Sequence, residues 1–387
     1  MFIKSQTKTR LSLFVKKIFR PISLRILLCN LLLCSVTHLT AQKNDGIDTA
    51  LIPFWKTTTM YNESVLMISE NGGLPAAKLL FKTDKILSVR NSALNTDYKE
   101  GVDWEYKHGQ LLLPKGSKAA YLTDEQLYPD TSANTFPKKG GGLILFHEGS
   151  FFHSHQLAVT YTHAPDQWKG PVTVFQGGEL PEVMDKLKRR ISLKMLLFGD
   201  SIAAGYNASG ETDSPPHLPS WGNLVAEGLR RYYKENIAFT NTSVAGKDSQ
   251  WGLATVQERV IAHDPDLVII AFGMNDGTGR MDPKLFKANI QGIISAVKQH
   301  NPKSEFILVV SMMPNPESNF LGTQELFEKV LAELTGPGVV LVDMDSVHTE
   351  LLKYKSYQDM TGNNINHPND FLIRWYAQEI LASLIPY

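Results

Sequence analysis

The sequence predicts an α/β protein in two structured parts, an antiparallel β-sandwich followed by a domain built on a parallel sheet. Up to about residue 185, short strand-like runs alternate with turn signals rich in Gly and Pro, which is typical of antiparallel β structure. Beyond about residue 190, compact apolar runs alternate with longer amphipathic segments. That alternation is typical of βα units around a parallel sheet covered on both faces.

The chain begins with the features of a secretory signal. Every charge before Ala41 is positive, and an apolar run at residues 26–36 follows the basic segment. This run is too short to span a bilayer comfortably, so we expect export with removal of residues 1–41 and no membrane span afterwards. The alternative is an uncleaved anchor. Cys29 and Cys34 both lie in the run, each preceded by Leu, which disfavours lipid attachment and leaves the mature chain without a disulfide.

The predicted sandwich occupies residues 42–185, and a polar linker at 186–192 separates it from the α/β domain at 193–387. Its expected strands are short and separated by turns: 64–68, 78–81, 85–89, 109–113, 142–147, 156–162 and 171–176. In the α/β domain, strands are expected at 194–198, 237–240, 267–272, 305–311 and 339–342. Helices are expected at 221–233, 251–262, 284–299, 323–334 and 368–384.

The charge balance argues against a nucleic-acid binder. The chain holds 39 basic and 39 acidic residues, but the seven positive charges of the leader leave 32 basic residues against 39 acidic ones. A protein that binds nucleic acid is expected to keep a basic surplus. We therefore expect no nucleic-acid partner.

Four loops of the α/β domain carry polar groups suited to acyl transfer. Ligands of parallel sheets bind beyond the carboxyl ends of the strands. The groups concerned are the hydroxyl of Ser201, the backbone of Gly246, the amide of Asn275 and the imidazole of His367, which directly precedes Pro368. Each loop alone fits ordinary capping or turn chemistry. Together they supply a nucleophile, a base and donors for an oxyanion.

These blocks resemble the GDSL/SGNH hydrolase family, which is named for its Ser, Gly, Asn and His. The resemblance runs from about residue 193 to the C-terminus and implies a flavodoxin-like three-layer α/β/α fold. It also implies that Ser201 is the nucleophile and His367 the general base, and that the N–H groups of Ser201 and Gly246 and the amide of Asn275 bind the oxyanion. No metal or organic cofactor is implied. The leading part resembles, more loosely, the β-sandwich of some bacterial carbohydrate esterases.

One position departs from the family pattern. The family usually has Asp three residues before the histidine, where this chain has Asn364. Three alternatives follow. The centre is a Ser–His dyad oriented by Asn364 or a main-chain carbonyl; another carboxylate, Asp359 or Asp370, takes the third place; or the site is catalytically silent.

Other side chains near the motif loops are candidates for substrate contact. Trp221 and Trp251 suit stacking on sugar rings or packing within the domain, and Met274 and Met313 are placed to line an acyl pocket. The histidine-rich stretch at residues 147–163 suits a polar face better than a metal site. If the two parts pack tightly, it could instead border the active cleft.

The sequence thus predicts an exported serine esterase that removes acyl groups, acetyl foremost, from an acylated carbohydrate. Two alternatives remain open. One is a lipase or thioesterase acting on longer acyl chains. The other is a glycan-binding protein with a silent hydrolase domain.

Overall fold

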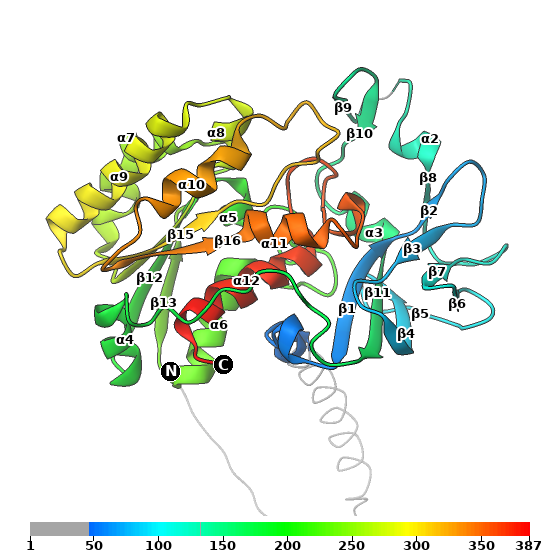
Figure 1. The fold of residues 1–387 in the computed structure, drawn as a ribbon, viewed down its shortest axis with the longest axis horizontal. Coiled ribbons are helices and arrows are strands. Elements are labelled where there is room, and N and C mark those ends of the chain that lie inside the picture. The colour runs from blue at the N-terminus through cyan, green and yellow to red at the C-terminus, as the bar shows by residue number, and fades with distance from the viewer. Residues whose placement is uncertain (1–45, 132) are drawn as a thin grey trace, which may run out of the picture. The chain divides into compact units, whose positions relative to one another are not determined.

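The structure is a computed structural model that describes residues 46–131 and 133–387 (Figure 1). The predicted secretory signal lies outside the described residues. Residues 46–387 fall into one compact unit. It combines a β-rich N-terminal part with a C-terminal α/β part, as the sequence predicts.

The C-terminal part is built on a five-stranded parallel sheet in the order β13-β12-β14-β15-β16. Its strands are β12 (Leu193–Gly199), β13 (Ile237–Asn241), β14 (Leu267–Ala271), β15 (Glu305–Val310) and β16 (Val339–Asp343). The order corresponds to the flavodoxin-like pattern 2-1-3-4-5. The predicted three-layer α/β/α fold is therefore confirmed.

Helices cover both faces of this sheet (Figure 1). One layer holds α6 (Trp221–Tyr233), α11 (Met344–Leu351) and α12 (Asp370–Leu384), and the other holds α7 (Ser249–Arg259), α9 (Pro283–His300) and α10 (Phe327–Ala332). Neighbouring strand residues point to opposite layers. Leu197 and Ile269 pack with the first layer, whereas Phe198 and Ile270 pack with the second. Burial on both faces explains why these strands are continuously apolar.

The N-terminal part is β-rich and mostly antiparallel. A four-stranded sheet has the order β1-β11-β4-β5, with β1 (Thr59–Leu66), β4 (Thr83–Asn91), β5 (Asp97–Tyr98) and β11 (Gln156–His163). A five-stranded sheet has the order β6-β7-β3-β2-β8, with β2 (Ile68–Ser69), β3 (Ala76–Lys78), β6 (Glu105–Lys107), β7 (Gln110–Leu112) and β8 (Leu122–Thr123). A separate pair joins β9 (Thr135–Pro137) to β10 (Leu143–Leu145).

Short helices depart from the sequence-based picture in this part and at the boundary. They are α2 (Asp124–Leu127), α3 (Phe151–His155) and α4 (Pro181–Lys188). Within the histidine-rich stretch, His153 and His155 lie on α3. The expected polar linker at residues 186–192 overlaps the end of α4, where Leu187 is fully buried. The boundary between the two parts remains a prediction.

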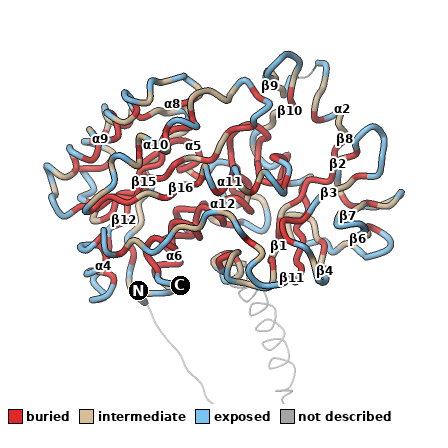
Figure 2. The backbone as a smooth tube through the Cα atoms, in the orientation of Figure 1, coloured by how far each residue is buried: buried red, intermediate tan, exposed pale blue. Residues whose placement is uncertain are grey.

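The segment at residues 171–176 is not the strand that its sequence suggested. Its backbone bonds α12 instead of another strand: the Thr173 N–H donates to Glu379 Oε2 at 2.6 Å, and the Gln176 N–H donates to the Ser383 carbonyl at 2.9 Å. These bonds take two of its backbone N–H groups, which in a strand would donate to a neighbouring strand. The segment therefore covers α12, which is buried along nearly its whole length (Figure 2).

Glu379 gives this contact a pH dependence that can be measured. Burial raises the pKa of its carboxyl to about 7. A folded-state pKa above the unfolded value means that stability falls as pH rises through the interval from about 4.5 to 7. We expect Glu379→Gln to be more stable than the native protein at pH 8, by up to about 3 kcal/mol, and nearly equal at pH 5. Urea unfolding at pH 5 and pH 8 measures the free energy of unfolding of both proteins. An equal difference between variant and native protein at the two pH values would contradict this expectation.

Candidate active site

Ser201 lies at the carboxyl end of the central strand β12. The strand ends at Gly199, and the short helix α5 (Ser201–Ala204) begins two residues later. A Cβ at Gly199 would lie 2.1 Å from the carbonyl oxygen of Ala271, so only glycine fits this close approach. Asp200 caps the helix by accepting the N–H of Ile202 at 2.9 Å. Ser201 is thereby fixed at a helix N-terminus on the edge of the sheet.

His367 reaches Ser201 from the loop that precedes α12. Its Nε2 lies 2.9 Å from Ser201 Oγ. Two hydrogen bonds within the loop hold it in place. The Gly362 N–H and the Thr361 hydroxyl each donate to the His367 carbonyl at 2.9 Å. Both residues are buried, with relative exposures of 4% for Ser201 and 5% for His367. The pair has the geometry of a nucleophile hydrogen-bonded to its base.

Gly246 and Asn275 follow β13 and β14 respectively, the two strands that flank β12. Asn275 is the second residue of α8 (Met274–Thr278), and its Nδ2 donates to the carbonyl of Lys247 at 2.9 Å. Gly246, with φ of +73°, adopts a left-handed conformation that suits glycine. The amide of Asn275 keeps a second N–H beyond the one given to Lys247. Asn275 is thus bonded to the residue that follows Gly246, at the carboxyl ends of the two strands that flank β12.

Three side chains meet the other ring nitrogen of the histidine. Around Nδ1 of His367 lie Asn207 Oδ1 at 2.7 Å, Asn363 Nδ2 at 3.0 Å and Glu148 Oε2 at 3.3 Å. None of them was singled out from the sequence, although the stretch that contains Glu148 was considered as a border of the cleft. That stretch does reach the site. Sequence spacing had pointed instead to Asn364.

The expectation that Asn364 orients the imidazole is not met. This residue is fully buried at a φ of +69°, and its Nδ2 donates to the carbonyl of Leu145 at 2.9 Å. Its Oδ1 accepts from Gln358 Nε2 at 3.1 Å and Asn315 Nδ2 at 3.3 Å. The side chain therefore fastens the loop to the N-terminal part.

Restoring the usual aspartate at this position should weaken the protein. In Asn364→Asp, a carboxylate oxygen would face the Leu145 carbonyl without a donor, which we expect to cost about 3 kcal/mol of folding free energy without raising kcat. Urea unfolding and ester hydrolysis of the purified variant measure both. Asn319→Asp, at an exposed loop position, is the matched control. A gain in kcat with unchanged stability would contradict the expectation.

Asp359 and Asp370 are also engaged elsewhere. Asp359 Oδ1 accepts the N–H of Leu66 at 2.7 Å, and Asp370 Oδ1 accepts the N–H of Ser209 at 2.8 Å. Neither carboxylate is among the hydrogen-bonding partners of His367. Their positions make them structural groups at the contact with β1 and at the start of α12.

The aromatic residues and methionines expected to touch substrate are mostly internal. Trp221 is fully buried and donates its Nε1–H to the carbonyl of Ile202 at 2.9 Å, and Met274 is fully buried as well. Trp221 therefore takes the packing role that the sequence left open beside sugar stacking, and Met274 does not line a surface pocket. Trp251 and Met313 are half-buried. Tyr206, which was not considered, is 45% exposed and lies edge-on to His367, with ring centroids 5.5 Å apart.

Two carboxyls near the site differ in their electrostatics. Burial raises the pKa of Asp200 to about 7, with a further contribution from the nearby carboxylate of Asp276. Burial also acts to raise the pKa of Glu148, but the hydrogen bond and charge attraction to His367 outweigh it, so the pKa lies below its ordinary value. Glu148 is therefore a carboxylate at neutral pH.

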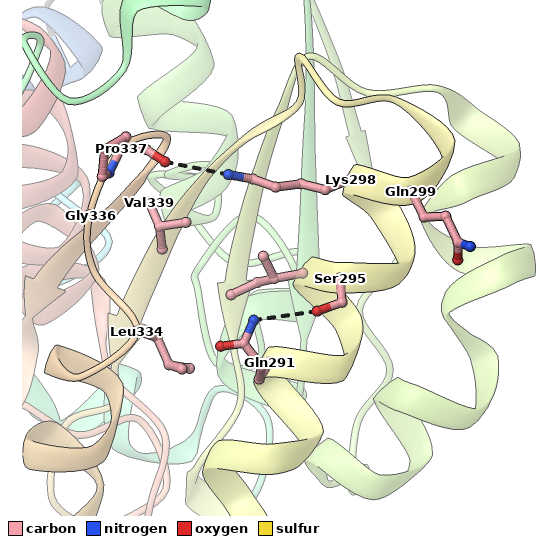
Figure 3. A pocket seen from close by; sticks show the side chains of 9 residues that line it. Gln291, Ser295, Lys298, Gln299, Leu334, Gly336, Pro337 and Val339 are labelled. Carbon is pink, nitrogen blue, oxygen red and sulfur yellow. Dashed lines mark hydrogen bonds between the residues drawn. The ribbon is translucent and has the colours of Figure 1, made fainter.

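Neither of two cavities in the structure is lined by Ser201 or His367. Each has a volume of about 570 Å³. One lies beside α9 and is lined by Gln291, Lys298 and Pro337 among others (Figure 3). Within the described residues, no three His, Cys, Asp or Glu side chains gather in a way that could hold a metal ion. Among those same residues, no helix is long and apolar enough to cross a membrane.

Residues 197–371 match the GDSL-like Lipase/Acylhydrolase family. This stretch is a GDSL-like hydrolase domain. It contains the four residues that the resemblance pointed to, Ser201, Gly246, Asn275 and His367.

Curated relatives of the GDSL-like domain include esterases. An arylesterase of Vibrio mimicus is 34% identical over 107 residues, a match that covers 28% of this chain and 50% of the relative. Thioesterase 1/protease 1/lysophospholipase L1 of Escherichia coli is 29% identical over 107 residues, covering 28% of this chain and 46% of the relative. The chain thus spans about half the length of the curated relatives it matches.

Solved structures with a similar fold include two carbohydrate esterases. A two-domain esterase active on acetylated mannans is 23% identical with a TM-score of 0.45, covering 55% of this chain and 54% of that one. An acetylxylan esterase from Geobacillus stearothermophilus is 20% identical with a TM-score of 0.41, covering 49% and 92%.

Proposed function

We propose that this protein is a carboxylic ester hydrolase in which Ser201 attacks the ester carbonyl. The contact of 2.9 Å between Ser201 Oγ and His367 Nε2 carries the proposal. His367 takes the hydroxyl proton as the Oγ–C bond forms, and it returns that proton to the leaving alcohol as the ester C–O bond breaks. Water then attacks the acyl-enzyme with His367 again as base, which releases the acid and regenerates Ser201.

The developing oxyanion would be held by donors at the strand ends. The backbone N–H of Ser201 opens α5 and has no partner within that helix. The backbone of Gly246 and the amide of Asn275 lie in the neighbouring loops, where they would complete the set. Such donors typically contribute about 3 kcal/mol each to the stabilisation of the transition state.

A fluorophosphonate probe tests the nucleophile directly. We expect the native protein to be labelled at Ser201, as located by peptide mass spectrometry, and the Ser201→Ala and His367→Ala variants to remain unlabelled. If the native protein neither reacts with the probe nor hydrolyses p-nitrophenyl acetate, the ester hydrolase proposal fails and the glycan-binding alternative takes its place.

For the substrate, we propose an acylated carbohydrate, with acetyl as the acyl group removed. The surroundings of the Ser–His pair support this: Glu148 brings a partly exposed carboxylate to His367, and Tyr206 offers an exposed ring beside it. Polar groups and one aromatic face suit a ring bearing hydroxyls better than a long alkyl chain.

Two measurements separate this substrate from the alternative of a longer acyl chain. The first compares p-nitrophenyl acetate with p-nitrophenyl octanoate; the second measures acetate released from acetylated plant polysaccharides. A preference for octanoate without acetate release would favour a lipase or thioesterase, activities that match the names of some curated relatives. Export, which rests on the sequence of residues 1–41, is tested by locating the protein in cell fractions.

A further inference from the structure

The groups around Nδ1 of His367 come from three separate parts of the chain. Asn207 follows α5, Asn363 belongs to the loop before α12, and Glu148 lies between β10 and α3 in the β-rich part. A catalytic histidine needs a partner here that keeps the proton on Nδ1 and stabilises the positive charge formed during catalysis. An aspartate three residues before His367 is absent, so these side chains are the available partners.

Asn207 fixes the tautomer of the imidazole. Its Nδ2 donates to the carbonyl of Gly149 at 2.9 Å and to the carbonyl of Gly362 at 3.2 Å, which uses both of its N–H groups. The amide oxygen must therefore face His367, 2.7 Å from Nδ1. Because an amide oxygen only accepts, Nδ1 carries the proton. The lone pair of Nε2 is then free to receive the proton of Ser201.

Asn363 holds Glu148 rather than the ring. Its two N–H groups have acceptors in Glu148 Oε1 at 3.0 Å and Asn366 Oδ1 at 2.9 Å. Its own oxygen accepts the backbone N–H of His367 at 3.1 Å. With Oε1 held in this way, Oε2 of Glu148 is left 3.3 Å from Nδ1.

The segment that carries Glu148 is clamped to the hydrolase domain on both sides. The Leu145 carbonyl accepts from Asn364 Nδ2 at 2.9 Å, and the Gly149 carbonyl accepts from Asn207 Nδ2 at 2.9 Å. Nearby, the Lys139 N–H donates to the Glu317 carbonyl at 2.6 Å. The position of the carboxylate is therefore set by the fold and not by a free loop.

We propose that the work of the absent aspartate is divided between two residues: Asn207 fixes the tautomer of His367, and Glu148, from the β-rich part, stabilises the imidazolium. Both are positioning residues that act through His367, and the inference rests on the proposed esterase function. It gives the β-rich part a role in catalysis itself, besides any binding of glycan. Because 44% of the Glu148 side chain is exposed, solvent weakens its attraction to the imidazolium.

Other titratable groups near His367 have to be distinguished from Glu148 in a pH profile. Tyr206 lies against the ring, and Asp200, whose pKa burial raises to about 7, precedes Ser201. Asp370 opens α12, where burial raises its pKa and the charge of His153 acts against that rise. A change seen only on replacing Glu148, and altered by salt, belongs to none of these groups.

The test is the pH dependence of kcat/KM for p-nitrophenyl acetate in Glu148→Gln, with Glu211→Gln, an exposed carboxylate near α5, as control. In a plot of kcat/KM against pH, the acid limb is the rise at low pH and the plateau is the constant value above it. We expect the glutamine variant to have a plateau about tenfold lower and an acid limb that lies about 0.5–1 pH unit lower in pH. Glu148→Asp should restore much of the limb position. Asn207→Ala should lower the plateau without moving the limb. The control should change neither quantity.

Salt gives a second measurement on the native protein. Raising NaCl from about 0.05 M to about 0.5 M should move its acid limb downward, whereas the limb of Glu148→Gln should stay in place. This arm carries the test if the glutamine variant does not fold. An unchanged plateau and limb in a folded Glu148→Gln, or a native limb insensitive to salt, would overturn the inference. Labelling of Ser201 by fluorophosphonate would then still support the esterase, so the two failures are distinguishable.

Discussion

Ser201→Ala is expected to lower kcat/KM for p-nitrophenyl acetate by at least about 10⁴-fold, because it removes the hydroxyl that lies 2.9 Å from His367 Nε2. The fold should survive. The backbone N–H of residue 201 remains, and the cap that Asp200 provides to α5 does not involve the serine side chain. The rate of ester hydrolysis and the melting temperature of the purified variant check the loss of activity and the intact fold.

Non-additivity makes this prediction sharper than loss of activity alone. When a nucleophile and its base act as a unit, removing either one costs about as much as removing both. The double variant Ser201→Ala/His367→Ala should therefore be no slower than the slower single variant. Ser154→Ala, an exposed serine on α3, serves as the control and should keep native activity. Multiplicative losses in the double variant would contradict a Ser–His unit.

The sequence predicted the α/β part well because its local pattern and its burial agree. Each strand of the parallel sheet is a short continuous apolar run, and each run lies between two helical layers that bury both of its faces. The strand expected at 171–176 was wrong because there the local pattern and the actual hydrogen-bonding partners disagree. Its alternation resembles a strand, but its hydrogen bonds go to Glu379 and Ser383 of α12, which no local pattern reveals.

The positions of Ser201 and His367 could be predicted because each lies at the boundary between a loop and an element that the sequence marks clearly. Their partners at Nδ1 could not be predicted in this way. Glu148 is 219 positions away from His367 in the chain, and only packing of the β-rich part brings it there. Asn363 and Asn364 are neighbours with opposite orientations, and counting back from the histidine selected the one that points away.

The choice between sugar stacking and packing for Trp221 could not be made from the sequence for a similar reason. Trp221 follows a motif loop, but it begins α6, whose apolar side packs on the sheet and α12, and its indole stacks on Tyr376 with ring centroids 5.7 Å apart. Sequence proximity to a motif does not show which side of a helix an aromatic ring occupies. Tyr206, in an irregular segment, carries no periodicity that would have marked it.

A buried ion pair joins the two parts of the chain. Lys355 Nζ lies 2.5 Å from Glu63 Oε1 on β1 and 3.6 Å from Asp359 Oδ2, and the side chains of Lys355 and Glu63 are fully buried. Glu63 also accepts the hydroxyl of Tyr161 at 2.5 Å and the N–H of Leu80 at 2.8 Å. These donors and the Lys355 ammonium together satisfy the buried carboxylate.

Lys355→Ala is expected to destabilise the protein by about 3–5 kcal/mol, because it leaves Glu63 charged and buried without its cation. Urea unfolding at pH 7.5 measures the loss. The control is Lys353→Ala: Lys353 lies two residues away and pairs with Glu350 at 2.6 Å while largely exposed, so little change is expected. Equal effects of the two variants would show that the buried pair contributes nothing beyond a surface one.

A double replacement without charges distinguishes the effect of losing the charges from the effect of losing side-chain volume. Lys355→Met/Glu63→Gln removes both charges at similar volume, so it should be more stable than Lys355→Ala. Burial opposes the charge of Lys355, but attraction to Asp359 and Glu63 outweighs this and raises its pKa. A raised pKa of a base contributes stability below about pH 10.5 that is lost above it, so the advantage of the native protein over Lys355→Ala should shrink only in strong alkali.

Because the same contact holds β1 against the hydrolase domain, Lys355→Ala should also loosen the docking of the β-rich part that carries Glu148. If Lys355→Ala loses ester hydrolysis as well as folding free energy, the docking of the β-rich part and the activity are linked.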